Sequence, residues 1–189
     1  MLQLLTTTVI GVALLVASTS FAQTSHPNPA VGQAPTTVPG NLLDQQDASF
    51  IKEAAAGGMA EVTLSKMAEK STNAEVKHFA EKMVQDHTAA NTELTAIANQ
   101  LGAEMPKTLD RDHQKIHDQL EGIHGKPFDQ QYMRVMVEDH QAVRLFRQEA
   151  NSGHDLRLKQ FAQKTLPTIE EHQKMASDLS RRLSETAAR

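Results

Sequence analysis

Apolar residues from Phe50 onward recur at intervals of three and four positions, and no segment of this part of the chain alternates regularly between apolar and polar residues. This spacing places the apolar side chains along one face of an α-helix. The pattern predicts four long helices, with apolar faces that begin at Phe50, Val76, Phe128 and Leu158. We therefore expect an all-α fold.

Local signals predict where these helices begin and end. The first helix is expected over residues 49–70, and the capping-box sequence Thr72-Asn73-Ala74-Glu75 is expected to open the second. Gly102 is a natural end for the second helix, because glycine readily adopts the left-handed conformation that follows a last helical turn. The sequence Asn151-Ser152-Gly153 should break the third helix, and Pro167 should kink or loosen the fourth.

The connection between the second and third helices, residues 102–127, is too long for a simple turn. It contains a short amphipathic helix, whose apolar residues are Leu109, Ile116 and Leu120. Two helical hairpins joined by one long crossover describe a ferritin-like four-helix bundle. We assign this bundle domain to residues 49–185.

The N-terminal segment predicts export. Residues 2–17 form an apolar run, and Ser20-Phe21-Ala22 follows with small residues where a signal peptidase requires them, although no Lys or Arg precedes the run. We expect a signal peptide over residues 1–22 and a periplasmic or secreted mature protein. A retained anchor helix is the alternative, but the run is short for a membrane span. The proline-rich composition of residues 23–48 predicts a disordered linker.

Composition excludes several classes of function. The chain of 189 residues has 19 basic and 23 acidic side chains, a balance that argues against nucleic-acid partners. It has no cysteine, so disulfides, thiolate nucleophiles and cysteine-ligated metals are excluded. We find no glycine-rich phosphate loop and no His-Glu-x-x-His motif. These observations favour a non-catalytic protein without an organic cofactor.

Each of the four predicted helices carries one ionisable residue on its apolar face: Glu61, His87, His140 and His172. Burial of such groups without partners is unfavourable. A rise of about 1.5 Å per residue places all four in one band about 10 Å deep near the middle of the bundle. One interpretation is a metal site of three imidazoles and a carboxylate, suited to Fe, Mn, Zn or Cu. The other is a buried polar layer in which Glu61 pairs with a histidine.

The acidic residues beside these histidines argue against a two-metal oxidase. Ferritin-like dimetal sites place Glu three residues before His, so that both point inward. Here Asp86, Asp139 and Glu171 stand immediately before the histidines, and adjacent helical residues point about 100° apart. We expect these acids outside the site or at helix–helix contacts. A single ion, or none, fits better than ferroxidase or oxygenase chemistry.

Two shorter motifs have weaker interpretations. His113 and His117 lie four residues apart on the crossover helix and share a face, which permits chelation, but a solvated surface is the favoured interpretation. Gly57-Gly58 inside the first helix lowers helix stability. We expect the pair to permit a close approach between helices opposite Glu61, with a local kink as the alternative.

Several short sequences along residues 50–183 resemble, in their order and spacing, a bacterial exported family. This is domain-of-unknown-function family forty-one forty-two, often labelled "predicted outer membrane protein". The resemblance implies a ferritin-like helical domain exported to the cell envelope, and it implies no biochemical activity. The sequences that carry it are Phe50, Gly57-Gly58-Met59-Ala60-Glu61, Val76-Lys77-His78-Phe79-Ala80, Asp86-His87, Phe128-Asp129, Tyr132, Asp139-His140, Phe161-Ala162, Leu166-Pro167 and His172.

These observations lead to three functional hypotheses. The first is a non-catalytic envelope protein that binds one transition-metal ion through the four polar residues and serves metal buffering or stress protection. The second is a helical interaction module that binds an envelope protein or a second copy of itself, with a purely structural polar layer. The third is a small ligand held in the bundle core beside that layer.

Overall fold

The computed structural model describes residues 43–138 and 140–187, and every regular element among them is an α-helix. All of these residues belong to one compact unit, residues 41–189. The predicted signal peptide and most of the predicted linker lie outside the described residues. The helices are α1 Gln45–Ala68, α2 Ala74–Leu101, α3 Arg111–Glu121, α4 Lys126–Glu138, α5 His140–Ser152 and α6 Leu156–Ala187. The predicted all-α class is therefore confirmed.

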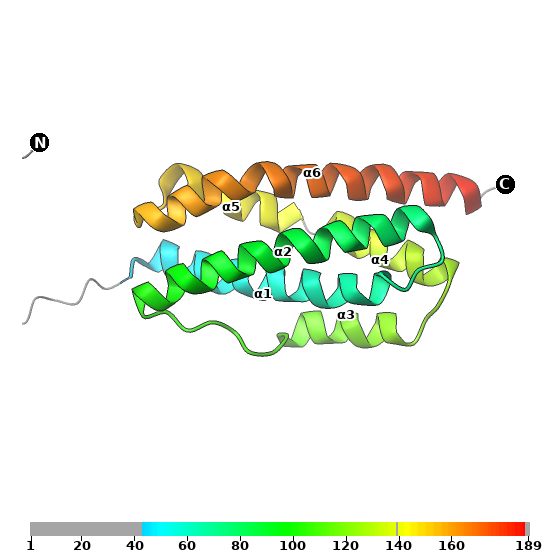
Figure 1. Ribbon diagram of the computed structural model, residues 1–189, viewed down its shortest axis with the longest axis horizontal. Coiled ribbons are helices and arrows are strands. Elements are labelled where there is room, and N and C mark those ends of the chain that lie inside the picture. Colours follow the sequence, from blue (N-terminus) through cyan, green and yellow to red (C-terminus); the bar gives the residue numbers. More distant parts are fainter. Residues whose placement is uncertain (1–42, 139, 188–189) are drawn as a thin grey trace, which may run out of the picture. The chain divides into compact units, whose positions relative to one another are not determined.

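The helices pack as a bundle in which α4 and α5 together occupy the place of the predicted third helix. The first hairpin joins α1 to α2, and the second joins α5 to α6. Helix α6 also contacts α2 and α4, and α1 also contacts α4 and α5. Figure 1 shows that α2 and the α4–α5 pair run in the same direction, so the chain between them must return along the bundle. That connection contains α3, which lies on the outside against α1 and α4.

Helix α1 begins at Gln45, four residues before the predicted start, so the segment expected to be linker ends earlier than residue 48. The reason is Asp44, whose side chain accepts a hydrogen bond from the Gln46 N–H at 2.8 Å and caps the helix. Apolar spacing alone did not reveal this polar first turn. Its residue Asp47 is buried, although nothing in the hydrophobic pattern singles it out.

The ends of the other helices follow the predicted signals with one correction. Asn73, rather than Thr72, is the N-cap of α2, because its side chain accepts from the N–H groups of Glu75 and Val76 at 3.0 and 3.3 Å. Gly102 ends α2 in the left-handed conformation, with φ of 70°, as expected. Helix α6 continues through Pro167 without ending.

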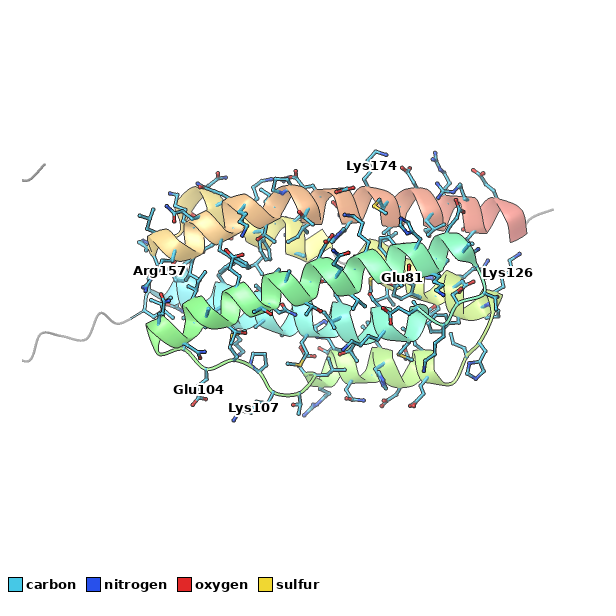
Figure 2. The ribbon with its side chains drawn as sticks, in the orientation of Figure 1. Glu81, Glu104, Lys107, Lys126, Arg157 and Lys174 are labelled. Atoms are coloured by element: carbon cyan, nitrogen blue, oxygen red, sulfur yellow. The ribbon has the colours of Figure 1, made fainter. Side chains whose placement is uncertain are left out.

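The hydrophobic core has two clusters, one on each side of the predicted polar band. One cluster includes Phe79 and Tyr132, and the other includes Phe50 and Phe161. Most charged residues lie on the outside, where side chains such as Glu81, Lys126 and Lys174 project from the helices (Figure 2). The polar band therefore separates two dry packing regions within one bundle.

The two adjacent glycines of α1 have different surroundings. A Cβ atom on Gly58 would overlap the side chain of Asn91 on α2, so Gly58 does permit a close approach between these helices. A Cβ atom on Gly57 would meet nothing within 4 Å. Only Gly58 therefore has a packing reason to lack a side chain.

We expect Gly57→Ala to raise the free energy of unfolding by about 1 kcal/mol, because alanine removes the helix penalty of glycine in open space. Gly58→Ala should give a smaller gain or a loss, because the Asn91 side chain must move. Urea unfolding of both variants measures the difference. Equal stabilisation by the two changes would contradict the packing role of Gly58.

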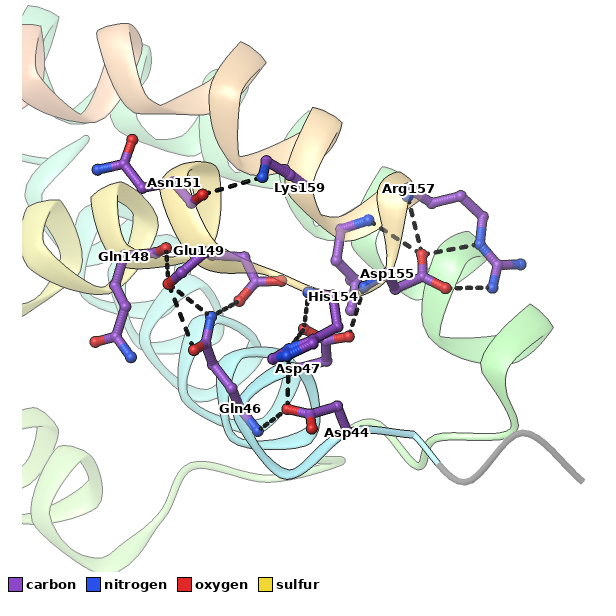
Figure 3. A network of polar contacts seen from close by, with 12 residues as sticks. Asp44, Gln46, Asp47, Gln148, Glu149, Asn151, His154, Asp155, Arg157 and Lys159 are labelled. Atoms are coloured by element: carbon purple, nitrogen blue, oxygen red, sulfur yellow. Dashed lines mark hydrogen bonds and ion pairs between the residues drawn. The ribbon is translucent and has the colours of Figure 1, made fainter.

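A second buried polar group lies where α1 meets the α5–α6 turn (Figure 3). The Asp47 carboxylate accepts hydrogen bonds from the backbone N–H groups of His154 and Asp155 at 2.9 and 2.7 Å. Glu149 is buried beside it and accepts from the Gln46 side chain at 3.3 Å. Burial, helped by the nearby Asp47 carboxylate and opposed by the hydrogen bond from Gln46, raises the pKa of Glu149 to about 7. This contact ties the first turn of α1 to the start of α6.

The raised pKa of Glu149 predicts a pH-dependent stability. Because the folded protein holds this proton to a higher pH than the unfolded chain, whose Glu pKa is 4.5, Glu149 lowers stability as pH rises from about 4.5 to about 7. Glu149→Gln should remove this part of the slope. Chemical unfolding across that pH range, with a chelator present, measures it. Exposed Glu185→Gln is the control, and an unchanged slope in Glu149→Gln would contradict the assignment.

Candidate functional site

Three of the four predicted site residues meet at mid-bundle. Glu61 comes from α1, His87 from α2 and His172 from α6. The Glu61 Oε2 atom lies 3.0 Å from His87 Nδ1, and His87 Nε2 lies 3.2 Å from His172 Nδ1. Both imidazoles are buried. The fourth predicted residue, His140, begins α5, and its side chain lies outside the part of the chain that the structure describes.

The line of polar contacts continues to the surface. His172 Nε2 lies 2.8 Å from Asp86 Oδ2, and Asp86 pairs with Lys82 on its own helix at 3.1 Å. Lys82 also lies 3.7 Å from exposed Glu171 on α6. Asp86 and Glu171 therefore lie at the contact between α2 and α6, as expected for acids that precede the buried histidines. The third such acid, Asp139, lies outside the described residues.

The two carboxylates determine which ring nitrogens carry hydrogen. An ionised carboxylate only accepts hydrogen bonds, so Glu61 and Asp86 require N–H at His87 Nδ1 and His172 Nε2. The remaining nitrogens, His87 Nε2 and His172 Nδ1, then face each other at 3.2 Å, each with a lone pair when its ring is neutral. Two lone pairs at that distance repel. A proton or a metal cation between the rings removes the repulsion.

The charges around the site support this description. Burial opposes ionisation of Asp86, but hydrogen bonds from His172 and Lys82 outweigh it and lower the pKa of Asp86 below its usual value. Burial lowers the pKa of His172, and the neighbouring His87 lowers it further, while Asp86 acts in the opposite direction. An ionised Asp86 beside a neutral His172 is therefore the favoured state near neutral pH.

The site has internal space and a route from outside. A cavity of about 20 Å³, room for about one water or ion, is lined by Glu61, His87 and His172 together with Met83 and Met136. Glu61 and His87 also line a larger, partly open cavity of about 800 Å³. The lining of that larger cavity includes more acidic than basic side chains, a charge balance that favours cations: Glu53, Glu61, Asp110, Asp112 and Glu138 against Arg144.

Two further groups of described residues bring three potential ligand atoms within 4.8 Å of one another: Asp44, Asp47 and His154, and His117, Asp118 and Glu121. Glu61, His87 and His172 are not such a group. His87 contacts Glu61 through Nδ1 and His172 through Nε2, so no single His87 nitrogen faces both residues. His113 contacts Asp110 at 2.7 Å, whereas His117 contacts Asp118 at 3.3 Å. A His113–His117 chelate, the less favoured interpretation of that motif, is not among the groups that the structure brings together in the described residues.

The Asp44 group was missed by sequence reasoning. His154 is 107 residues from Asp47 along the chain, so no local spacing connects them. The available local signal was the acidic first turn of α1, which is ordinarily explained by helix capping.

Comparison with known proteins agrees with the fold. The profile of the family "Domain of unknown function (DUF4142)" matches residues 32–179, and the chain belongs to this family. The predicted resemblance is therefore confirmed. A solved structure described as "Crystal structure of DUF305 fragment from Deinococcus radiodurans" is similar, with 16% sequence identity and a TM-score of 0.62. The similarity covers 74% of this chain and 98% of that one, and it concerns the fold alone. No curated protein matches. Among the described helices, none is both long and apolar enough to cross a membrane.

Replacement of Asp86 tests its contact with His172 directly. Asp86→Asn should lower the pKa of His172 further, because the carboxylate that favours its charged form is removed. The imidazole resonances of His172, followed by NMR during a pH titration, measure the change. Asp118→Asn on α3 is the matched control, since Asp118 contacts the partly exposed His117 and is far from His172 in the chain. A His172 pKa that is equal in wild type and Asp86→Asn would contradict the contact.

Proposed function

We propose that this protein is an exported envelope protein whose ferritin-like bundle binds one transition-metal ion at His87 and His172. Its role is non-catalytic, in metal buffering or in protection against metal and oxidative stress. The proposal places the mature protein in the periplasm or outside the cell, on the basis of the apolar run and the Ser20-Phe21-Ala22 sequence.

The observation that carries the proposal is the 3.2 Å separation of His87 Nε2 and His172 Nδ1. Two imidazole nitrogens bound at about 2.0–2.1 Å to one tetrahedral ion lie about 3.3 Å apart. The outer nitrogen of each ring contacts a carboxylate, Glu61 or Asp86. Metal-binding histidines usually have such a partner, which orients the ring and increases its basicity.

This geometry changes the proposed role of Glu61. Glu61 contacts His87 Nδ1, the ring nitrogen that does not face His172, so it orients the His87 ring. It would become a metal ligand only after its side chain rotates. Water in the small cavity and His140, which the helix heights place in the same band, remain proposed further ligands. Imidazole and oxygen donors suit Fe, Mn, Zn or Cu.

The ferritin-like arrangement in this proposal is supported by helix pairing. Two hairpins are joined by a long connection that contains a short helix, and α2 runs parallel to the α4–α5 pair (Figure 1). This is the topology of bundles with one long crossover. One facing pair of imidazoles provides for a single ion, which favours binding over two-metal redox chemistry.

The proposal is tested by metal content. Protein purified from the periplasm without a metal-affinity tag should contain near-stoichiometric metal at the core site, measured by elemental analysis. His172→Ala should lose that ion, and the binding constant for the same metal, measured by calorimetry, should fall by at least about tenfold. His78→Ala, an exposed histidine on α2, is the control. Equal metal content in wild type and His172→Ala would overturn the proposed site.

The alternative function is a helical interaction module with a structural polar layer. It is favoured because a series of contacts runs from Glu61 through the two histidines and Asp86 to Lys82. One proton between the two imidazoles is enough to satisfy every polar group in this series. Under this alternative the core site stays metal-free, and an envelope protein or a second copy of the chain is recovered by crosslinking. Replacement of His172 would then affect stability alone.

A further inference from the structure

We infer a second metal site, independent of the core histidines, in which Asp44, Asp47 and His154 bind a divalent transition-metal ion. The site joins the first turn of α1 to the turn between α5 and α6. It would hold the two ends of the chain segment 44–154 together, far along the helices from His87 and His172.

The three potential ligands already lie close together (Figure 3). His154 Nδ1 is 3.2 Å from Asp44 Oδ1 and 4.0 Å from Asp47 Oδ1, and one ligand atom from each residue lies within 4.8 Å of the others. Ligands on one tetrahedral Zn²⁺ are separated by about 3.3 Å. His154 is exposed and Asp44 is partly exposed, so side-chain rotations can bring the set to that spacing.

The buried member of the set is held in place before any ion binds. Both oxygens of Asp47 accept backbone N–H groups, from His154 and Asp155, and each oxygen keeps another lone pair. Asp44 is positioned as the N-cap of α1. The site therefore combines two positioned carboxylates with one exposed imidazole, that of His154.

An independent observation points to a cation here. Glu149 is 1% exposed, and its Oε1 atom has no hydrogen-bond partner among the described residues. Figure 3 shows its carboxyl group beside Gln46 and directed toward His154 and Asp47. A buried oxygen without a donor is unfavourable, and a nearby positive ion compensates for it.

The local charges lead to the same conclusion. The carboxylates of Asp44, Asp47 and Glu149 gather around one imidazole, that of His154. The next acidic residue, Asp155, is already paired with Arg157 at 2.7 Å, so that guanidinium group is engaged with Asp155. A divalent cation would balance the negative charges of Asp44 and Asp47.

The donor types indicate which ions fit. One imidazole and two carboxylates suit Zn²⁺, Mn²⁺ or Fe²⁺ better than Ca²⁺, which prefers oxygen ligands throughout. Because the donors come from both sides of the contact, an ion that binds the folded state would stabilise it.

The experiment is a calorimetric titration with Zn²⁺ of the full chain, purified without a metal-affinity tag. We expect His154→Gln and Asp44→Asn each to lose one bound Zn²⁺ per chain, or to weaken it at least about tenfold. Both should also lose one part of the Zn²⁺-induced rise in the thermal midpoint. His117→Gln is the matched control, because His117 belongs to an exposed group on a single helix. Zn²⁺ binding that is equal in wild type, His154→Gln and Asp44→Asn would overturn the inference.

The two metal sites are distinguished in the same titration. Loss of one Zn²⁺ in His154→Gln, with no loss in His172→Ala, would support this site and exclude Zn²⁺ as the ion of the core site. Loss only in His172→Ala would do the reverse. Equal losses in His154→Gln and His117→Gln would show unspecific surface binding and would overturn the present inference. His154→Gln, Asp44→Asn and His117→Gln leave the hydrophobic core side chains in place, so these three variants remain measurable as folded proteins.

Discussion

The 3.2 Å contact between His87 and His172 imposes a condition on the rest of the bundle. Both rings are buried, and each has a carboxylate at its outer nitrogen, so their inner nitrogens need a shared cation, either a proton or a metal. A pair of this kind is stable only if the helices α2 and α6 hold one register. The polar line therefore specifies which turns of the two helices lie at the same height, independently of any ligand.

The apolar packing is arranged around this condition. One hydrophobic cluster includes Met83 and Ala176, and the other includes Leu94 and Ile169. Along α2, His87 lies between Met83 and Leu94, and along α6, His172 lies between Ile169 and Ala176. Close packing on both sides keeps the imidazoles away from bulk solvent, which strengthens their electrostatic interactions. The small cavity beside them leaves room for an additional atom or water.

The end of the bundle near Asp47 shows a related arrangement with a different consequence. Here a buried carboxylate accepts backbone N–H groups from the α5–α6 turn, and a second carboxyl group, Glu149, lies behind it. At mid-bundle the unfavourable feature is a pair of facing lone pairs, and at this end it is an excess of carboxylates. A positive ion would relieve both features.

The sequence by itself determined the all-α class, the four apolar faces and the mid-bundle polar band, because helical periodicity is encoded within a few neighbouring residues. It placed Glu61, His87 and His172 at similar heights, and the end of α2 at Gly102 followed from the conformation of glycine. Only the tertiary structure decided that Asp86 reaches across to His172 and that Asp47 meets His154. It also decided that Gly58, and not Gly57, lies against α2. These contacts join residues about a hundred positions apart or depend on how far a helix is rotated about its axis, and neither quantity is recorded in local spacing.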